Sequence, residues 1–183
     1  MRFLIPVLAS VGSLVAADTY QIDPSHTAAL FSVNHLGFAN TWGRFNDVSG
    51  SVTWDDQDPG KNAVSVVIKT ASIDTGSAKK DEHLRNADFF SVKEFPEMTF
   101  VSKKFEKKDG NVFHVTGDFT LHGVTKSLTI PVTKMGAGKD PYGKERIGFD
   151  AVFTIKRSDY GMNFGLPGIG DEVRITFASE GVK

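Results

Sequence analysis

Apolar and polar residues alternate along most of this 183-residue chain, which is the signature of β-strands with one buried face. Over residues 113–121 the odd positions are apolar or small, and the even positions are polar. The same period recurs at 29–35, 47–55, 63–70, 97–105, 128–132, 146–156 and 172–179. Short polar connections rich in glycine, proline and aspartate separate these segments, which favours antiparallel neighbours. The pattern predicts one all-β domain of about eight strands.

Residues 76–96 depart from this period. Ser77 stands where a residue caps a helix, and we expect a short helix that ends near Phe89 and Phe90, before Pro96. His122 and Gly123 follow one strand and precede the next, so they predict a tight hairpin turn. In this interpretation His122 is a turn residue. The role of residues 118–132 is to supply the alternating apolar side chains on either side of that turn.

The alternation does not say which face points inward. A water-soluble barrel hides its apolar face, whereas an outer-membrane barrel turns that face to lipid and carries aromatic girdles at both interfaces. The chain has 15 phenylalanines, which sit mid-strand, but only 3 tyrosines and 2 tryptophans. This distribution favours the soluble barrel over the membrane barrel, and fractionation of cells would separate the two.

The chain opens with Arg2 and the apolar run "FLIPVLASVGSLVAA", which ends in the small residues Ala16 and Ala17. This is the pattern of a secretory signal peptide, and the run is too short for a membrane-spanning helix. We therefore expect residues 1–17 to be a cleaved signal peptide and residues 18–183 to be the exported domain. No later segment is apolar enough to span a membrane as a helix.

Composition gives little support for other classes of function. A net charge of −1 provides no electrostatic reason to bind nucleic acid. With 0 cysteines there is no disulfide and no thiolate ligand. His114 and His122 share a strand face but lie roughly 27 Å apart on a straight strand, so they cannot hold one metal ion. We find no metal-binding spacing and no nucleophile elbow, and predict no catalytic residue, metal or cofactor.

The irregular loop 157–165 contains the residue whose role the sequence leaves most open, Arg157. The favoured interpretation is a contact between Arg157 and Asp159 that fixes the loop. The alternative is that Arg157 faces an anionic head group at the mouth of a barrel.

The apolar face supplies the positive signal. An eight-stranded barrel is either just filled by its side chains or holds one small ligand. The expected inner face mixes large with small residues, which would leave a tunnel, namely Phe119, Phe149, Phe153 and Phe177 with Gly117 and Ala151. A solid phenylalanine core is the alternative.

Several stretches, in order, resemble the YceI-like family of bacterial secreted proteins. They are "YQIDPSHTAALFSVNHLGFANTWGRF", "SIDTGSAKKDEHLRNADFFSVKEFPEMTF", "GDFTLHGVTKSLTIPV", "RIGFDAVFTIKRSDYG" and "GDEVRITF". The resemblance covers essentially all of residues 18–183. It implies an eight-stranded antiparallel lipocalin-like barrel with a short helical segment, which encloses a long polyisoprenoid lipid, such as an isoprenoid quinone or prenyl phosphate, in the periplasm. Members of the family often form homodimers, although no exposed seam is evident here.

Strand parity and the family fold together give the ligand-binding candidates. The expected lining residues are Phe31, Val33, Phe100, Phe119, Phe149, Phe153 and Phe177. Four more residues are expected to close one end, namely Phe89, Phe90, Phe164 and Leu166. The polar candidates for a head group are His26, Asn34 and Arg157. A lipocalin-like enzyme acting on an isoprenoid is the second hypothesis, which a polar triad inside the cavity would reveal. Transport, storage and stress protection all stay open as the role.

Overall fold

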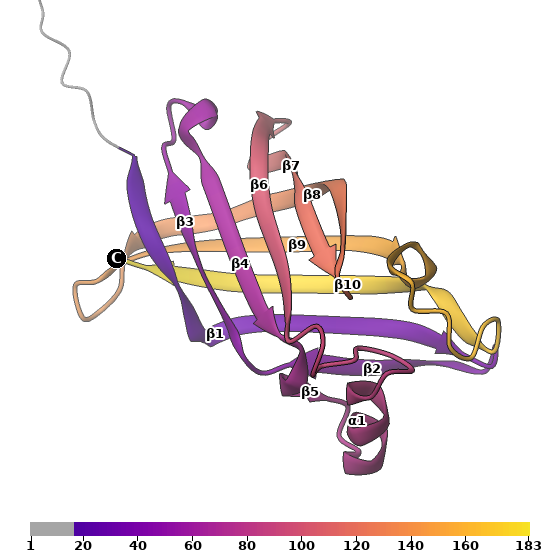
Figure 1. Cartoon of the computed structure of the whole chain (residues 1–183). Coiled ribbons are helices and arrows are strands. Elements are labelled where there is room, and N and C mark those ends of the chain that lie inside the picture. Colours follow the sequence, from indigo (N-terminus) through magenta and orange to yellow (C-terminus); the bar gives the residue numbers. More distant parts are fainter. Residues whose placement is uncertain (1–16) are drawn as a thin grey trace, which may run out of the picture.

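The computed structural model describes residues 17–183, and they form a closed antiparallel β-barrel with one short α-helix (Figure 1). Residues 1–16 of the predicted signal peptide lie outside the described part. The strands are β1 (Asp18–His35), β2 (Ala39–Phe45), β3 (Val48–Trp54), β4 (Ala63–Lys69), β5 (Ile73–Asp74), β6 (Glu97–Lys107), β7 (Val112–Leu121), β8 (Val124–Lys139), β9 (Glu145–Lys156) and β10 (Ile169–Val182). The helix is α1 (Ala78–Arg85), and short 3-10 turns lie at Pro59–Lys61, Thr70–Ser72 and Arg157–Tyr160.

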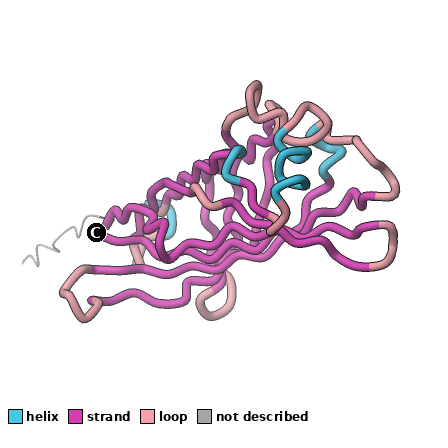
Figure 2. Tube along the Cα trace, turned by 90° about the horizontal axis from the view of Figure 1, so that it is seen from below, coloured by secondary structure: helices cyan, strands magenta, loops and turns pink. Residues whose placement is uncertain are grey.

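The strands occupy eight positions around the barrel. The order is β1, β3, β4, β6, β7, β8, β9 and β10, and the pairing of β10 with β1 closes the circle. β2 shares a position with β3, because β1 pairs with β3 over residues 18–21 and with β2 over residues 29–35. The predicted eight-stranded antiparallel barrel is therefore confirmed. Figure 2 shows the strands running along an elongated molecule, with loops at both ends.

Three strands differ from the prediction, and one of them is the two-residue β5, which was not predicted. β1 begins at Asp18, well before the predicted 29–35 segment, and has a register shift between Ile22 and Thr27. β2 was not predicted, because its sequence "ANTWGRF" does not alternate cleanly. Gly43 interrupts the pattern for a steric reason, since a Cβ at Gly43 would lie 2.4 Å from Cζ of Phe31. The missing side chain gives the Phe31 ring its place in the interior.

α1 ends at Arg85, so it is shorter than predicted, and Phe89 and Phe90 lie in the turns that follow it. Ser77 does occupy the N-cap position, but its side chain makes no capping hydrogen bond. The buried Asp81 carboxylate instead accepts hydrogen bonds from the backbone N–H and the hydroxyl of Thr75, at 2.8 and 2.6 Å. These bonds attach α1 to the end of β5.

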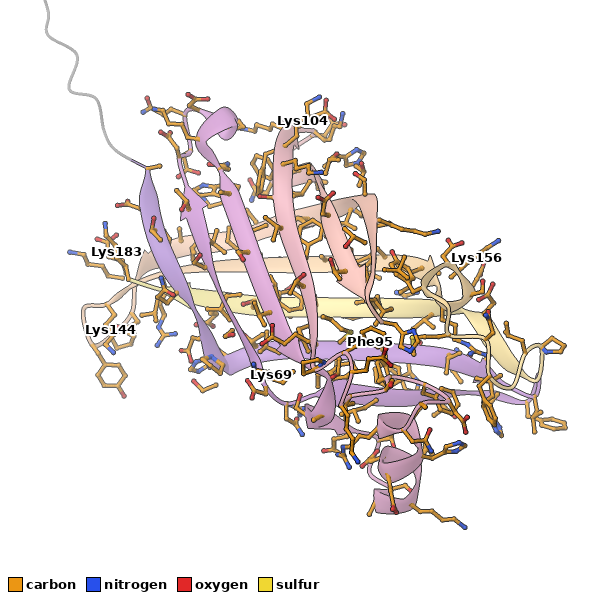
Figure 3. The ribbon with its side chains drawn as sticks, viewed as in Figure 1. Lys69, Phe95, Lys104, Lys144, Lys156 and Lys183 are labelled. Carbon is orange, nitrogen blue, oxygen red and sulfur yellow. The ribbon has the colours of Figure 1, made fainter. Side chains whose placement is uncertain are left out.

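The β7–β8 hairpin forms as predicted. His122 and Gly123 have φ angles of 51° and 74°, the left-handed conformations of a type I′ turn. The His122 ring donates from Nδ1 to the carbonyl oxygen of Tyr160 at 3.1 Å and packs against Phe95 with 4.5 Å between ring centroids (Figure 3). His122 therefore joins the hairpin to two other loops, which is a structural role.

The apolar face of the strands points into the barrel. Along β7 every second residue is buried, in the sequence Phe113, Val115, Gly117, Phe119 and Leu121. One end of the interior is packed solid by a cluster around Trp54, whose ring lies 4.9 and 5.0 Å from those of Phe113 and Phe149. We call this cluster the plug, and its buried members are Tyr20, Val52, Trp54, Phe113, Val115, Ile130 and Ile147.

An ion cluster lies at the seam between β1 and β10. Arg146 on β9 donates hydrogen bonds to Asp23 of β1 at 2.8 Å, to Asp140 of the β8–β9 turn at 2.8 Å and to Glu180 of β10 at 2.9 Å. The pKa of Asp23 is lowered well below its usual range by hydrogen bonds from Ser25, Arg146 and His26. The pKa of Asp140 is also lowered, chiefly by Arg146. Within residues 17–183, no helix is long and apolar enough to cross a membrane.

Gly117 gives a first prediction. A Cβ at this position would lie 2.5 Å from the carbonyl oxygen of Val101 and 2.6 Å from Cζ of Phe100. Valine favours strands, so a loss of stability in Gly117→Val reports the clash. We expect the free energy of unfolding, measured with urea, to fall by about 1–3 kcal/mol. Thr116→Val, on the outer face of the same strand, is the control and should change it by no more than about 0.5 kcal/mol. Equal effects would contradict the steric explanation.

The Arg146 cluster predicts the pH dependence of stability. Because the carboxyl pKa values are lower in the folded than in the unfolded protein, their stabilisation is present above the unfolded pKa of about 4 and is lost as the pH falls below it. Urea unfolding between pH 7 and pH 2 should show this loss. In Arg146→Met the loss over the same interval should be smaller, although Ser25 and His26 still stabilise the Asp23 carboxylate. An unchanged pH dependence in the variant would refute this role of Arg146.

Candidate functional site

A large apolar cavity occupies the part of the barrel that the plug leaves unfilled. Its volume is about 590 Å³, within the range of about 300–1,000 Å³ typical of small-molecule sites. Its walls come from β1, β2, β4, β6, β7, β8, β9 and β10, with α1 and the turn after it on one side. Lys80 and His83 of α1 and His35 of β1 are exposed residues that also line it, so the cavity meets solvent there. We call this region the mouth.

Most of the residues selected from the sequence lie around this cavity. Those that line it are Phe31, Val33, Phe89, Phe90, Phe100, Phe119, Phe153, Phe177 and Arg157. They come from five strands, from the turns after α1 and from the 3-10 turn that begins at Arg157, and the barrel closure brings them together. Their position makes them available to a ligand, and their part in binding one stays a prediction.

Sequence reasoning missed other lining residues. Leu121 and Ile155 line the cavity and share the strand parity of Phe119 and Phe153, so the same pattern indicates them. Phe45 lies on β2, which was not predicted. Lys80 and His83 lie on α1, and nothing in the sequence signals that this helix borders the barrel interior.

Phe149 differs from its prediction. It has the inward parity of Phe153, yet it does not line the cavity, because its ring packs against Trp54 in the plug. The two small residues expected to leave a tunnel also lie outside the cavity lining. The Phe100 ring occupies the space that a side chain at Gly117 would need, and Ala151 is buried. The interior is thus solid at one end and hollow at the other, and parity alone cannot tell the two ends apart.

Aromatic rings gather at the mouth. The ring of His83 lies 5.0 Å from that of Phe89 and 5.4 Å from that of Phe164, and all three contacts among these rings are edge-on. Phe164 is 45% exposed, and Leu166 nearby in sequence is 37% exposed. Neither lines the cavity, although Phe164 packs on residues that do. Phe164 thus lies beside the mouth, and the part of Phe164 and Leu166 in closing this end stays a prediction.

Two of the polar candidates lie away from the cavity. The Asn34 side chain accepts a hydrogen bond from the backbone N–H of Gly37 at 2.9 Å and so fixes the β1–β2 turn. His26 is exposed beside Asp23 and Ser25. Both partners meet the same ring atom, Nδ1, at 2.9 and 3.1 Å. A proton relay of the Ser-His-Asp type uses both ring nitrogens, so this arrangement does not form one.

Arg157 lines the cavity but does not contact Asp159. The favoured interpretation of the sequence was therefore wrong about the partner of Arg157. The guanidinium is buried and donates to the carbonyl oxygens of Met162, Ile169 and Gly170 at 2.7, 2.8 and 2.8 Å. Asp159 instead pairs with Lys126 at 3.3 Å. Burial lowers the pKa of Arg157, and the nearby Asp171 opposes this. Arg157 thus fixes the loop before β10 through backbone carbonyls.

Comparison with known proteins places this site in a family. The model of the YceI-like domain matches residues 20–180. Protein YceI of Escherichia coli O157:H7 is 41% identical over 179 residues, which cover 97% of this chain and 93% of the relative. The crystal structure of Burkholderia cenocepacia BcnA matches with a TM-score of 0.80 at 28% identity, covering 87% of this chain and 98% of that one.

A second solved structure is described as a polyisoprenoid binding domain from Saccharophagus degradans. It matches with a TM-score of 0.73 over 89% of this chain and 97% of that one. At 17% identity this likeness shows the fold alone. The family match covers nearly all of the described barrel, and the relatives extend over nearly the whole chain. The chain therefore belongs to the YceI-like domain family.

Proposed function

We propose that this protein is an exported binding protein that holds an isoprenoid lipid in its barrel cavity. The observation that carries the proposal is the cavity itself, which measures about 590 Å³ and has a lining dominated by apolar side chains. A structural neighbour with this barrel is described as a polyisoprenoid binding domain. The predicted signal peptide at residues 1–17 supports action after export, in the periplasm.

The physical basis is burial of the apolar chain. Each Å² of apolar surface removed from water contributes about 25 cal/mol, so a branched hydrocarbon chain gains affinity without specific polar contacts. The rings of Phe31, Phe119 and Phe153 come from three different strands, so they contact a ligand from several sides. Such a wall selects for apolar shape rather than for one functional group, which suits an isoprenoid tail.

Native mass spectrometry tests the proposal directly. The protein would be purified from its native host without denaturant, and its bound lipid would then be extracted and identified. We expect a stoichiometric isoprenoid adduct on the chain that begins at Asp18, recovered from the periplasmic extract. Protein that carries no lipid and takes up neither added quinone nor prenyl phosphate would overturn the proposal.

Filling the cavity gives a second prediction. Phe153→Trp on β9 adds volume to a lining residue, so it should lower the amount of bound isoprenoid severalfold while the barrel stays folded. The readouts are lipid occupancy by mass spectrometry and the thermal unfolding midpoint by circular dichroism.

The matched control is Val152→Trp. Val152 precedes Phe153 on the same strand but is 41% exposed, so tryptophan there stays outside the cavity. Its occupancy should equal that of the wild type. If both variants, or neither, lose lipid while folded, the cavity is not where the lipid binds.

A further inference from the structure

Three of the six polar side chains that line the cavity lie at its mouth, namely His35, Lys80 and His83; the others are Thr41, Thr99 and Arg157. Deep in the cavity, Phe100, Ile130 and Phe153 present only hydrocarbon. Arg157 is the one buried cation in the lining within residues 17–183, and its Nε, Nη1 and Nη2 each donate to a backbone carbonyl. A polar head group driven into the deep end would lose its hydration without compensation. An amphiphilic ligand therefore enters with its tail first.

A second hollow lies along α1, outside the mouth. Its lining residues are Ser77, Lys79, Lys80, Glu82, His83 and Asn86. Lys80 and His83 also line the apolar cavity, so the two spaces adjoin. Lys79, Glu82, His83 and Asn86 are three or four residues apart, which places them on one side of the helix. We call this space the α1 hollow, and a ligand with its tail in the cavity would present its head group here.

The α1 hollow has positive charge available. Lys79 and Lys80 are exposed, and within residues 17–183 neither ammonium group forms an ion pair. Most other lysines of the described chain do pair with a carboxylate. The Nε2 atom of His83 lies 2.9 Å from a carboxylate oxygen of Asp88. The Asp88 carboxylate therefore already has a partner. Among the residues that the structure describes, Glu82 is the only acid that lines the hollow, and two lysines line it as well.

We propose that the α1 hollow binds the phosphate or diphosphate head group of a prenyl phosphate whose tail occupies the cavity. Lysine ammonium groups form charge-assisted hydrogen bonds to phosphate oxygens, and His83 and Ser77 add further donors at the same rim. The inference rests on the proposed lipid-binding function and extends it, because it selects anionic over neutral isoprenoids and orients the ligand.

Paired ligands with one tail and different heads test this inference. Binding of geranylgeranyl diphosphate and of geranylgeraniol to the mature protein would be measured by calorimetry at low salt. We expect the diphosphate to bind about tenfold more tightly, a preference that two exposed charged contacts can supply. In 1 M salt, where the screening length is about 3 Å, the preference should shrink.

The variant Lys79→Gln/Lys80→Gln should lose most of the preference, with about a twofold change or less in the affinity for the alcohol. The control Lys107→Gln/Lys144→Gln removes the same charge from two exposed lysines. Lys107 is paired with Phe113 of the plug, and Lys144 lies in the β8–β9 turn, far from α1 (Figure 3). The control should keep the tenfold preference.

The outcomes separate the two proposals. If neither ligand binds, the lipid-binding function itself fails. If both bind equally, or if the control variant loses the preference as fully as the α1 variant, lipid binding stands and the head-group site is overturned. The last measurement is the binding of pyrophosphate alone. If it binds as tightly as the prenyl diphosphate, the hollow is a site for free phosphates, and the inference is also overturned.

Discussion

The pairing of β1 with β10 is the interaction on which the rest of the structure depends. The two strands are far apart in sequence, and their register runs from Gln21 with Val182 to His35 with Ile169. This pairing turns an open sheet into a barrel, so no strand edge is left between them. It also brings Phe31 and Val33 of β1 beside Val173 and Ile175 of β10 around one interior. The cavity exists because this seam closes.

The interior divides into a plug and a cavity, and the division explains how a barrel without cysteine can be both stable and hollow. At one end Trp54 makes edge-on or tilted contacts with Phe105, Phe113 and Phe149, and such a cluster buries large apolar area. At the other end the Arg157 guanidinium holds three backbone carbonyls and fixes the loop that borders the cavity. The plug and the loop held by Arg157 thus border the cavity.

Much of the fold could be predicted from the sequence. All eight barrel positions contain a segment that the apolar alternation indicates, and the turn at His122 and Gly123 has the predicted conformation. The missed elements are those in which tertiary contacts override the pattern. β2 lacks regular alternation because Gly43 accommodates Phe31, and local sequence does not carry that reason. α1 ends at Arg85, where Asn86 takes an extended conformation.

The sequence by itself determined the strand periods, the apolar face and the family, and with them the inward position of six strand residues that line the cavity, namely Phe31, Val33, Phe100, Phe119, Phe153 and Phe177. Only the tertiary structure decided where along the barrel the interior is hollow, since Phe149 and Phe153 share one strand and one parity but lie in the plug and the cavity respectively. It also decided that Arg157 binds carbonyls rather than Asp159, and that α1 brings Lys80 and His83 to the mouth. Periodicity fixes the direction of a side chain, whereas packing between distant strands fixes what that side chain meets.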